Sequence, residues 1–176
     1  MKKKYVKDYV ADETVKGGYR YTGVYYTDSL SDDIRKKNGL IHLIVGILQI
    51  AFVLIAASIN CMGNRTIYVV IPMECTLFCA LNLCLGAYTF LKSSNRMELH
   101  QYEGSYMRMV QSVTVAFFLN IGSVIGQIVV LAKGTYEFGL LNEILLLGAL
   151  ILMGAVNAAE WRWHRKLISL VVKEES

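Results

Sequence analysis

The chain is poor in proline and histidine, and its longest apolar stretches contain almost no charge. Its 176 residues include one proline and three histidines, and away from the ends of the apolar stretches the only charged residue is Glu74. A soluble four-helix bundle carries a charged outer face on every helix, and no stretch here has one. The scarcity of charge argues against a soluble bundle and for a membrane protein.

Motifs with a defined chemistry are also lacking. The chain contains no phosphate-cradling glycine loop and no nucleophile constellation. Cys61 stands alone, and Cys75, Cys79 and Cys84 lie within one apolar stretch, where cysteine usually serves as a small apolar side chain. We therefore predict that the protein is not an enzyme and has no catalytic residue.

Metal and nucleic-acid binding have little support in the sequence. His42, His100 and His164 lie on separate segments, so their spacing forms no metal-binding pattern. The formal net charge of +4 comes from basic residues that flank the apolar stretches, with acids mixed among them in the N-terminal segment. We predict no metal, no other cofactor and no nucleic-acid partner.

Four apolar stretches dominate what is present. They cover residues 39–59, 66–91, 110–132 and 138–159. About 20 helical residues, each rising about 1.5 Å, cross the roughly 30 Å hydrocarbon core of a bilayer. The sequence therefore predicts an all-α membrane protein with four transmembrane helices in an antiparallel bundle, surrounded by the lipid bilayer.

The distribution of basic residues predicts the orientation. Of 18 lysines and arginines, only Arg65 and Lys133 lie in the connections after the first and third stretches. The others flank the remaining ends of the stretches, and loops rich in lysine and arginine stay on the cytoplasmic side. Both termini are therefore expected in the cytoplasm. The spans are expected in a bacterial inner or plasma membrane.

The polar segments divide the chain further. We expect a tyrosine-rich cytoplasmic arm over residues 1–38, the transmembrane bundle over 39–159 with a cytoplasmic linker at 92–109, and a cytoplasmic tail over 160–176. The tail begins with aromatic and basic side chains that are typical of an anchor at the membrane interface. These are Trp161, Arg162, Trp163 and Arg165.

Local patterns predict some structure in these segments. Gly17 to Thr27 mixes aromatic and β-branched residues with glycines, which predicts an extended segment or a hairpin turning at Thr22-Gly23. Ser29 or Ser31 is expected to cap the first helix. Arg96 to Glu103 has helical spacing and is expected to extend a neighbouring span.

Polar residues within the stretches group by depth. Counted from the outer boundary at about 1.5 Å per residue, one group lies roughly 8 to 15 Å deep and a second roughly 24 to 27 Å deep. The first comprises Glu74, Gln49, Ser123 and Gln127; the second comprises His42, Asn82 and Asn157; Asn120 lies between them. Because polar side chains face the bundle and not the lipid, we expect two polar layers in the core.

Glu74 is the sharpest candidate for a functional residue. A carboxylate at that depth requires a partner, water or a proton. Pro72 removes a backbone donor nearby and is expected to kink the helix. These features suit either a proton or cation carrier or a protonated, hydrogen-bonded residue with a packing role, and the sequence leaves both open.

Small residues predict where helices approach closely. Gly122 and Gly126 have the GxxxG spacing, and Gly154 and Ala158 the related small-xxx-small spacing. A shift of 69 residues aligns Glu74 and several neighbouring residues with Glu143 and its neighbours. Duplication of the two halves is therefore an open alternative.

Two functions are compatible with these features. The first is a non-enzymatic accessory or interaction subunit of a membrane complex that docks through its arm and linker. The alternative is a small proton-coupled or cation transporter that uses Glu74. Either role is compatible with a protein partner or with a homo-oligomer.

Overall fold

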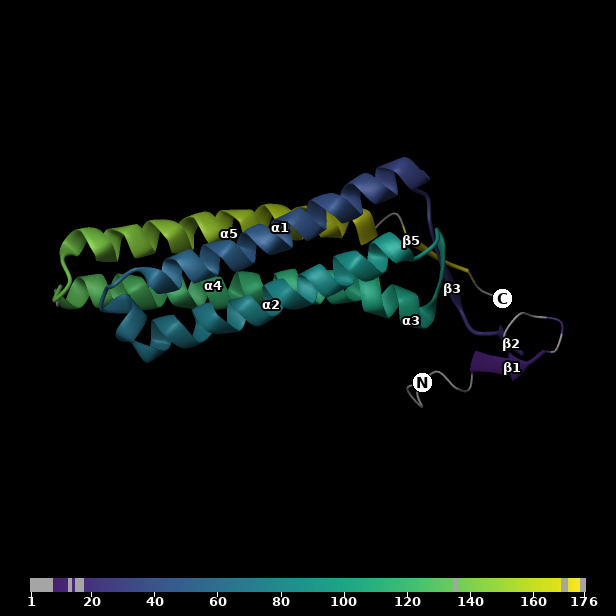
Figure 1. Cartoon of the computed structure of the whole chain (residues 1–176), viewed down its shortest axis with the longest axis horizontal. Helices are drawn as coiled ribbons and strands as arrows, with labels where there is room; N and C mark the ends of the chain where they lie inside the picture. The colour runs from purple at the N-terminus through teal and green to yellow at the C-terminus, as the bar shows by residue number, and fades with distance from the viewer. Residues whose placement is uncertain (1–7, 13, 15–17, 135, 169–170, 175–176) are drawn as a thin grey trace.

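Four long helices lie side by side in the computed structural model, which describes residues 8–12, 14, 18–134, 136–168 and 171–174 (Figure 1). They are α1 (Asp32–Ser58), α2 (Ile67–Lys92), α4 (Arg108–Lys133) and α5 (Leu140–Ile168). The helices pack antiparallel, and each is long and apolar enough to cross a membrane. The predicted four-helix bundle is therefore confirmed.

The first and last helices are longer than their apolar stretches. α1 begins directly after Ser31, one of the two expected caps, and has two acidic residues in its first turn, where the helix dipole favours negative charge. α5 continues past Ala159 because its buried face continues through His164 and Leu167. The predicted arm and tail therefore each contribute helical turns to the bundle.

The third span also has a long extension. α3 (Leu99–Tyr102) and the π-helical turn η3 (Glu103–Met107) lead into α4, and together they form one helical segment from Leu99 to Lys133. The helix expected over Arg96 to Glu103 is therefore present only from Leu99. The first three of those residues form strand β4 (Arg96–Glu98) instead.

A small sheet covers one end of the bundle, which we call the sheet end. Its central strand β3 (Tyr25–Asp28) pairs antiparallel with β4 on one side and with β5 (Val171–Glu174) on the other. Arm, linker and tail thus each supply one strand. At the opposite end, which we call the loop end, the short helix η2 (Gly63–Arg65) connects α1 to α2.

The arm does not form the predicted hairpin at Thr22-Gly23. Strand β2 (Tyr19–Tyr21), before that turn, pairs with β1 (Tyr9–Ala11). Strand β3, after the turn, pairs only with β4 and β5 among the described residues. Of the two expected forms, the extended segment is present and the hairpin is wrong, because the partners of β3 come from segments far away in the sequence.

A buried ion pair joins the sheet to the helices. Asp28, the last residue of β3, lies 3.1 Å from the guanidinium of Arg35 in α1. The hydroxyl of Tyr106 donates a 3.0 Å hydrogen bond to the same carboxylate. Arg35 also donates to Asn95 and Ser93, which precede β4. These contacts fix the arm and linker against the bundle.

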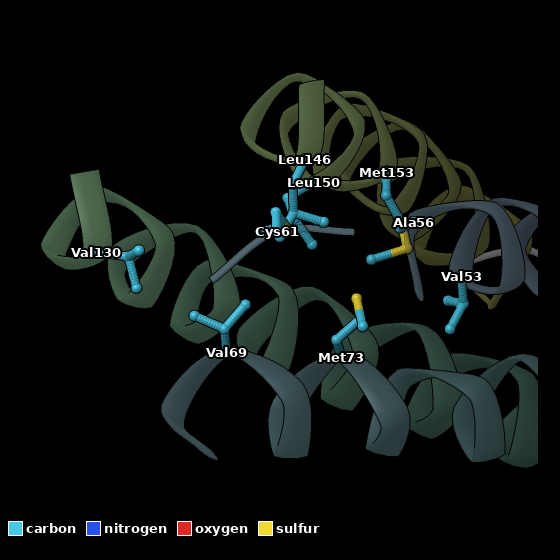
Figure 2. Packing of buried hydrophobic residues seen from close by; sticks show 9 residues of the cluster. All are labelled: Val53, Ala56, Cys61, Val69, Met73, Val130, Leu146, Leu150 and Met153. Atoms are coloured by element: carbon cyan, nitrogen blue, oxygen red, sulfur yellow. The ribbon is translucent and has the colours of Figure 1, made fainter. Parts of the chain in front are cut away.

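Two apolar clusters fill the ends of the core. The loop-end cluster, shown in Figure 2, draws on all four long helices and comprises Val53, Ala56, Cys61, Val69, Met73, Val130, Leu146, Leu150 and Met153. The sheet-end cluster comprises Leu83, Ala87, Phe90, Met97, Tyr106, Met109, Val113 and Leu167. Large apolar side chains such as Leu54, Ile71, Phe118 and Leu152 are exposed on the outside of the helices, as expected for contact with lipid.

Candidate functional site

Buried polar side chains line the interface between α1 and α5. α1 places His42 and Gln49 there, and α5 places Asn157, Glu160 and His164 there, all buried. His42 and Gln49 are seven residues apart, and the residues of α5 follow at intervals of three and four, so each set lies on one helix face. Helical periodicity therefore brings five polar side chains to the α1–α5 interface.

His42, Glu160 and His164 form a compact group, which we call the histidine–glutamate cluster. His42 Nδ1 lies 2.6 Å from Glu160 Oε1, and His164 Nε2 lies 3.5 Å from the same oxygen. The two imidazole rings stack with their centres 4.2 Å apart. Neither histidine side chain is exposed, and only 3% of the Glu160 side chain is. One carboxylate oxygen thus faces two fully buried imidazoles.

Each imidazole also has a nitrogen without a hydrogen-bond partner among the described residues. His42 Nε2 and His164 Nδ1 are buried and have no hydrogen-bond partner among the residues that the structure describes. Leaving a buried polar atom unpaired costs about 1 to 3 kcal/mol. Because an imidazole nitrogen can donate to a base, accept a proton or ligate a metal ion, the cluster has unused binding capacity. The ligand atoms of its three residues all lie within 4.8 Å of one another, which makes them candidates for holding a metal ion.

Amide side chains extend the polar core from this cluster toward the loop end. Gln49 Nε2 donates a 2.8 Å hydrogen bond to Asn157 Oδ1. Asn120 of α4 lies against Gly154, where an added Cβ atom would be 2.5 Å from Asn120 Oδ1. The glycine therefore makes room for the asparagine between α4 and α5.

A second buried carboxylate lies at the loop end of the same helix. Glu143 accepts hydrogen bonds from the backbone N–H groups of Met62, at 2.6 Å, and Gly63, at 3.2 Å. Its third donor is Gln127 Nε2 at 2.9 Å. Cys61 packs nearby, where burial raises the pKa of its thiol. Glu143 thus ties the α1–α2 connection to α4 and α5.

The expected outer layer is distributed differently. Gln127 lies with Glu143, and Gln49 lies with Asn157 of the expected inner layer. The hydroxyl of Ser123 donates to backbone oxygens of α2 and α4. Glu74 is half-buried and makes no hydrogen bond or ion pair with any residue that the structure describes.

Of the expected inner layer, His42 and Asn157 lie in the polar core. Asn82 lies on the outer face between α2 and α4, where its amide donates a 2.7 Å hydrogen bond to the hydroxyl of Ser112. The layer therefore gains Glu160 and His164 from α5 and does not include Asn82.

The residues expected at helix contacts have different surroundings. A Cβ atom at Gly126 would lie 2.8 Å from the carbonyl oxygen of Tyr68, so α2 and α4 approach closely there. Gly122 has ordinary contacts with Pro72, at 3.9 Å from a Cβ built on it. Gly154 accommodates Asn120, as described above, and Ala158 is half-buried.

The residues expected to anchor the tail lie along the last turns of α5. Trp161 stacks on Phe117 of α4, and the Trp163 ring centre lies 5.2 Å from that of His42. Arg162 and Arg165 are exposed, and Arg165 lies over the Trp161 ring. Trp163 therefore borders the histidine–glutamate cluster.

Sequence reasoning did not single out Glu143, Glu160 or His164 as site residues. Glu160 and His164 fall just beyond the fourth apolar stretch, where polar residues suit a boundary. The available signal was the spacing of Asn157, Glu160 and His164, which matches one helix face. That signal has meaning only if the helix continues to Ile168, as it does.

No known protein family, curated protein or solved structure matches this chain. Fold and site therefore define it by class, as a small helical protein with four candidate membrane spans and a buried polar core.

Proposed function

We propose that this chain is a non-enzymatic integral membrane protein that binds a cation in the histidine–glutamate cluster and carries it across the bilayer. The observation that carries the proposal is the buried Glu160 carboxylate between two imidazoles that have unpaired nitrogens. Ionisable residues within membrane spans are expensive to bury and commonly mark ion pathways. The nearly complete burial of the three side chains suits an occluded binding site better than an open pore.

The proposal uses Glu160 in place of Glu74. Both are glutamates on candidate spans, but Glu74 is half-buried and has no described partner. Glu160 is buried and has two nitrogen-bearing neighbours with which it can share a cation. The two residues therefore provide a matched pair for a test.

The test measures cation flux into liposomes that contain the purified protein, with Na⁺, K⁺ and divalent cations offered separately. We expect wild-type protein to move at least one of these cations and Glu160→Gln to abolish that flux. Glu74→Gln makes the same chemical change outside the cluster and should leave the flux unchanged. If no cation moves, or if both variants behave alike, transport through this cluster is refuted.

The proposed orientation has both termini in the cytoplasm, in an inner or plasma membrane. It is supported by the lysines and arginines that the structure describes, which lie toward the sheet end except for Arg65 and Lys133 at the loop end. The test replaces Thr14 or Asn64 by a single cysteine in a chain without native cysteines. In intact cells the two cysteines should differ in their reaction with a thiol reagent. A membrane-impermeant thiol reagent should label position 64 only, and labelling at position 14 would reverse the orientation.

A second candidate function, an accessory subunit that docks through the sheet end, is favoured by the exposed strands there. β4 and β5 are edge strands of the three-stranded sheet. The β1–β2 pair is attached through a hydrogen bond from Tyr9 to Glu98, and burial together with this bond raises the pKa of Tyr9. Edge strands can pair with a strand of another chain.

This candidate predicts a second polypeptide, or a second copy of the chain, in the purified sample. Removing residues 1–22 would delete β1 and β2 but keep β3, so the three-stranded sheet should persist. Loss of the partner with unchanged cation flux would support docking through the arm. A partner that stays bound would exclude the β1–β2 pair as its docking surface.

A further inference from the structure

We infer that the cation held by His42, Glu160 and His164 is a divalent transition-metal ion of the zinc type. This inference rests on the same cluster as the proposed function and names the class of its ligand. The three residues come from two helices and are brought together only by the packing of α1 against α5.

The type of ligand atom selects this class of ion. Two imidazoles and one carboxylate are a donor set that suits Zn²⁺, Fe²⁺, Co²⁺ and Ni²⁺. Ca²⁺ and Mg²⁺ prefer a shell made mainly of oxygen atoms, which two histidines do not provide. Cu⁺ prefers thiolate and thioether sulfur, and the cluster has none.

The distances are compatible with a shared ion. Zinc binds nitrogen and carboxylate oxygen at about 2.0 to 2.2 Å, so tetrahedral ligands lie about 3.4 Å from one another. The ligand atoms here lie within 4.8 Å of one another, and His42 Nδ1 and Glu160 Oε1 are 2.6 Å apart. Side-chain shifts of about 1 Å would bring all three to one ion.

The unpaired nitrogens fit the same interpretation. A histidine that binds a metal through one nitrogen keeps the other for a hydrogen bond that orients the ring. Neither ring nitrogen of His164 has a described hydrogen-bond partner, so Nε2, 3.5 Å from Glu160, is an unused ligand atom and Nδ1 is left for such a bond. Asn157, one turn before Glu160, also has an unpaired amide nitrogen. It can serve as a hydrogen-bond donor that orients a ligating carboxylate.

The position in the helix also favours a cation. α5 ends at Ile168, so His164 lies in its last turns and Glu160 about one turn earlier. The carbonyl end of a helix carries a partial negative charge that stabilises nearby positive charge. Together with the Glu160 carboxylate, this offsets part of the charge of a divalent ion.

The test begins with purified full-length protein, stripped of metal with a chelator and titrated with Zn²⁺ or Co²⁺ in detergent. We expect a single ion per chain, which an excess of Mg²⁺ or Ca²⁺ does not displace. X-ray absorption at the zinc edge should show imidazole nitrogens at about 2.0 to 2.1 Å. Absence of zinc binding by the wild-type chain, or a shell without imidazole, overturns the inference.

Variants locate the ion. Glu160→Gln and His164→Gln should each weaken Zn²⁺ binding at least about tenfold, because each removes a ligand. The control is His100→Gln, which alters a partly exposed histidine that lies 3.1 Å from Glu98 at the sheet end. The affinity of His100→Gln for Zn²⁺ should equal that of the wild-type chain. A loss of binding in His100→Gln alone would assign the ion to the surface and overturn the inference.

The inference and the proposed function can fail separately. Zinc binding by the wild-type chain without cation flux would refute transport and leave the metal site standing. Flux of another cation by a chain that binds no zinc would refute the metal site and leave transport standing. Helicity measured by circular dichroism shows which variants fold, and the absorption spectrum of the wild-type site does not depend on any variant.

Discussion

α5 carries two buried glutamates whose surroundings differ in one chemical respect. Glu143, at the loop end, accepts hydrogen bonds from two backbone N–H groups and a glutamine amide. Glu160, toward the sheet end, faces two imidazoles, each of which has a second nitrogen without a described partner. Burial is complete or nearly so at both residues. The difference lies in the partners: those of Glu143 can only donate hydrogen bonds, whereas the imidazoles beside Glu160 can also bind a proton or a metal ion.

The difference teaches that a buried carboxylate is not in itself a sign of function. The oxygens of Glu143 accept hydrogen bonds from N–H donors, so this carboxylate stabilises one arrangement of the chain. Imidazoles can change protonation and ligate ions, so Glu160 lies in a site with several chemical states. Asp28 belongs with Glu143 in this respect, because Arg35 and Tyr106 act only as donors to it.

The prediction with the largest expected effect on stability tests whether Asp28 is a structural residue like Glu143. Arg35→Met removes the guanidinium and leaves Asp28 buried without its charge partner, so we expect a loss of about 3 to 5 kcal/mol in the free energy of unfolding. Denaturant unfolding in mixed micelles measures it. Lys36→Met removes an exposed neighbouring charge and is the control. A loss no greater than that of the control would show that the buried ion pair between Asp28 and Arg35 does not stabilise the sheet end.

The next prediction concerns Glu143. Glu143→Gln removes a charged acceptor and turns an amide toward backbone N–H groups, so the free energy of unfolding should fall by about 2 to 3 kcal/mol. Hydrogen exchange should speed up at Met62 or Gly63, because the glutamine side chain keeps only one acceptor oxygen for the two N–H groups. Zinc binding and cation flux should stay unchanged in whatever fraction folds. Loss of zinc binding in folded protein would remove the contrast with Glu160.

Glu160→Gln should have the reverse pattern. The amide can still accept a hydrogen bond from His42, so the free energy of unfolding should change by less than about 1.5 kcal/mol. Zinc binding, in contrast, should weaken at least about tenfold and flux should be lost. The same two assays therefore separate the two glutamates. A large stability loss without any change in binding would make Glu160 a structural residue like Glu143.

The smallest expected effect is at the exposed edge of the sheet. The hydrogen bond from Thr27, and then the charge of Arg96, hold the pKa of Glu174 below its ordinary value of 4.5. The pKa of Glu174 is lower in the folded chain than in the unfolded chain. The stability that the ionised carboxylate gives to β5 is therefore complete above the ordinary pKa and is lost as the pH falls through the folded pKa. Amide exchange in β5 should therefore accelerate in acid relative to the α-helices. In Glu174→Gln, the ratio of amide exchange in β5 to that in the α-helices should no longer depend on pH.

The depth count in the sequence failed for a geometric reason. It assumed that all spans end in one outer plane, but Glu143 is level with Met62 and Gly63, and Asn157 is level with Gln49. α5 is therefore shifted along α1 by roughly two helical turns from the expected register. The shift puts Gln49 beside Asn157, and it brings His42 level with Glu160.

The sequence by itself determined the four spans, because their length and lack of charge admit few other structures. It also located the start of α1 near Ser31 and the buried polar faces of α1 and α4, since both depend on nearby residues. The tertiary structure alone decided which faces meet and at what register. Glu160 reaches His42 across 118 residues of sequence, and β3 pairs with strands from the linker and the tail. Periodicity fixes the direction in which a side chain points, but the neighbour it meets depends on how whole helices slide and rotate against each other.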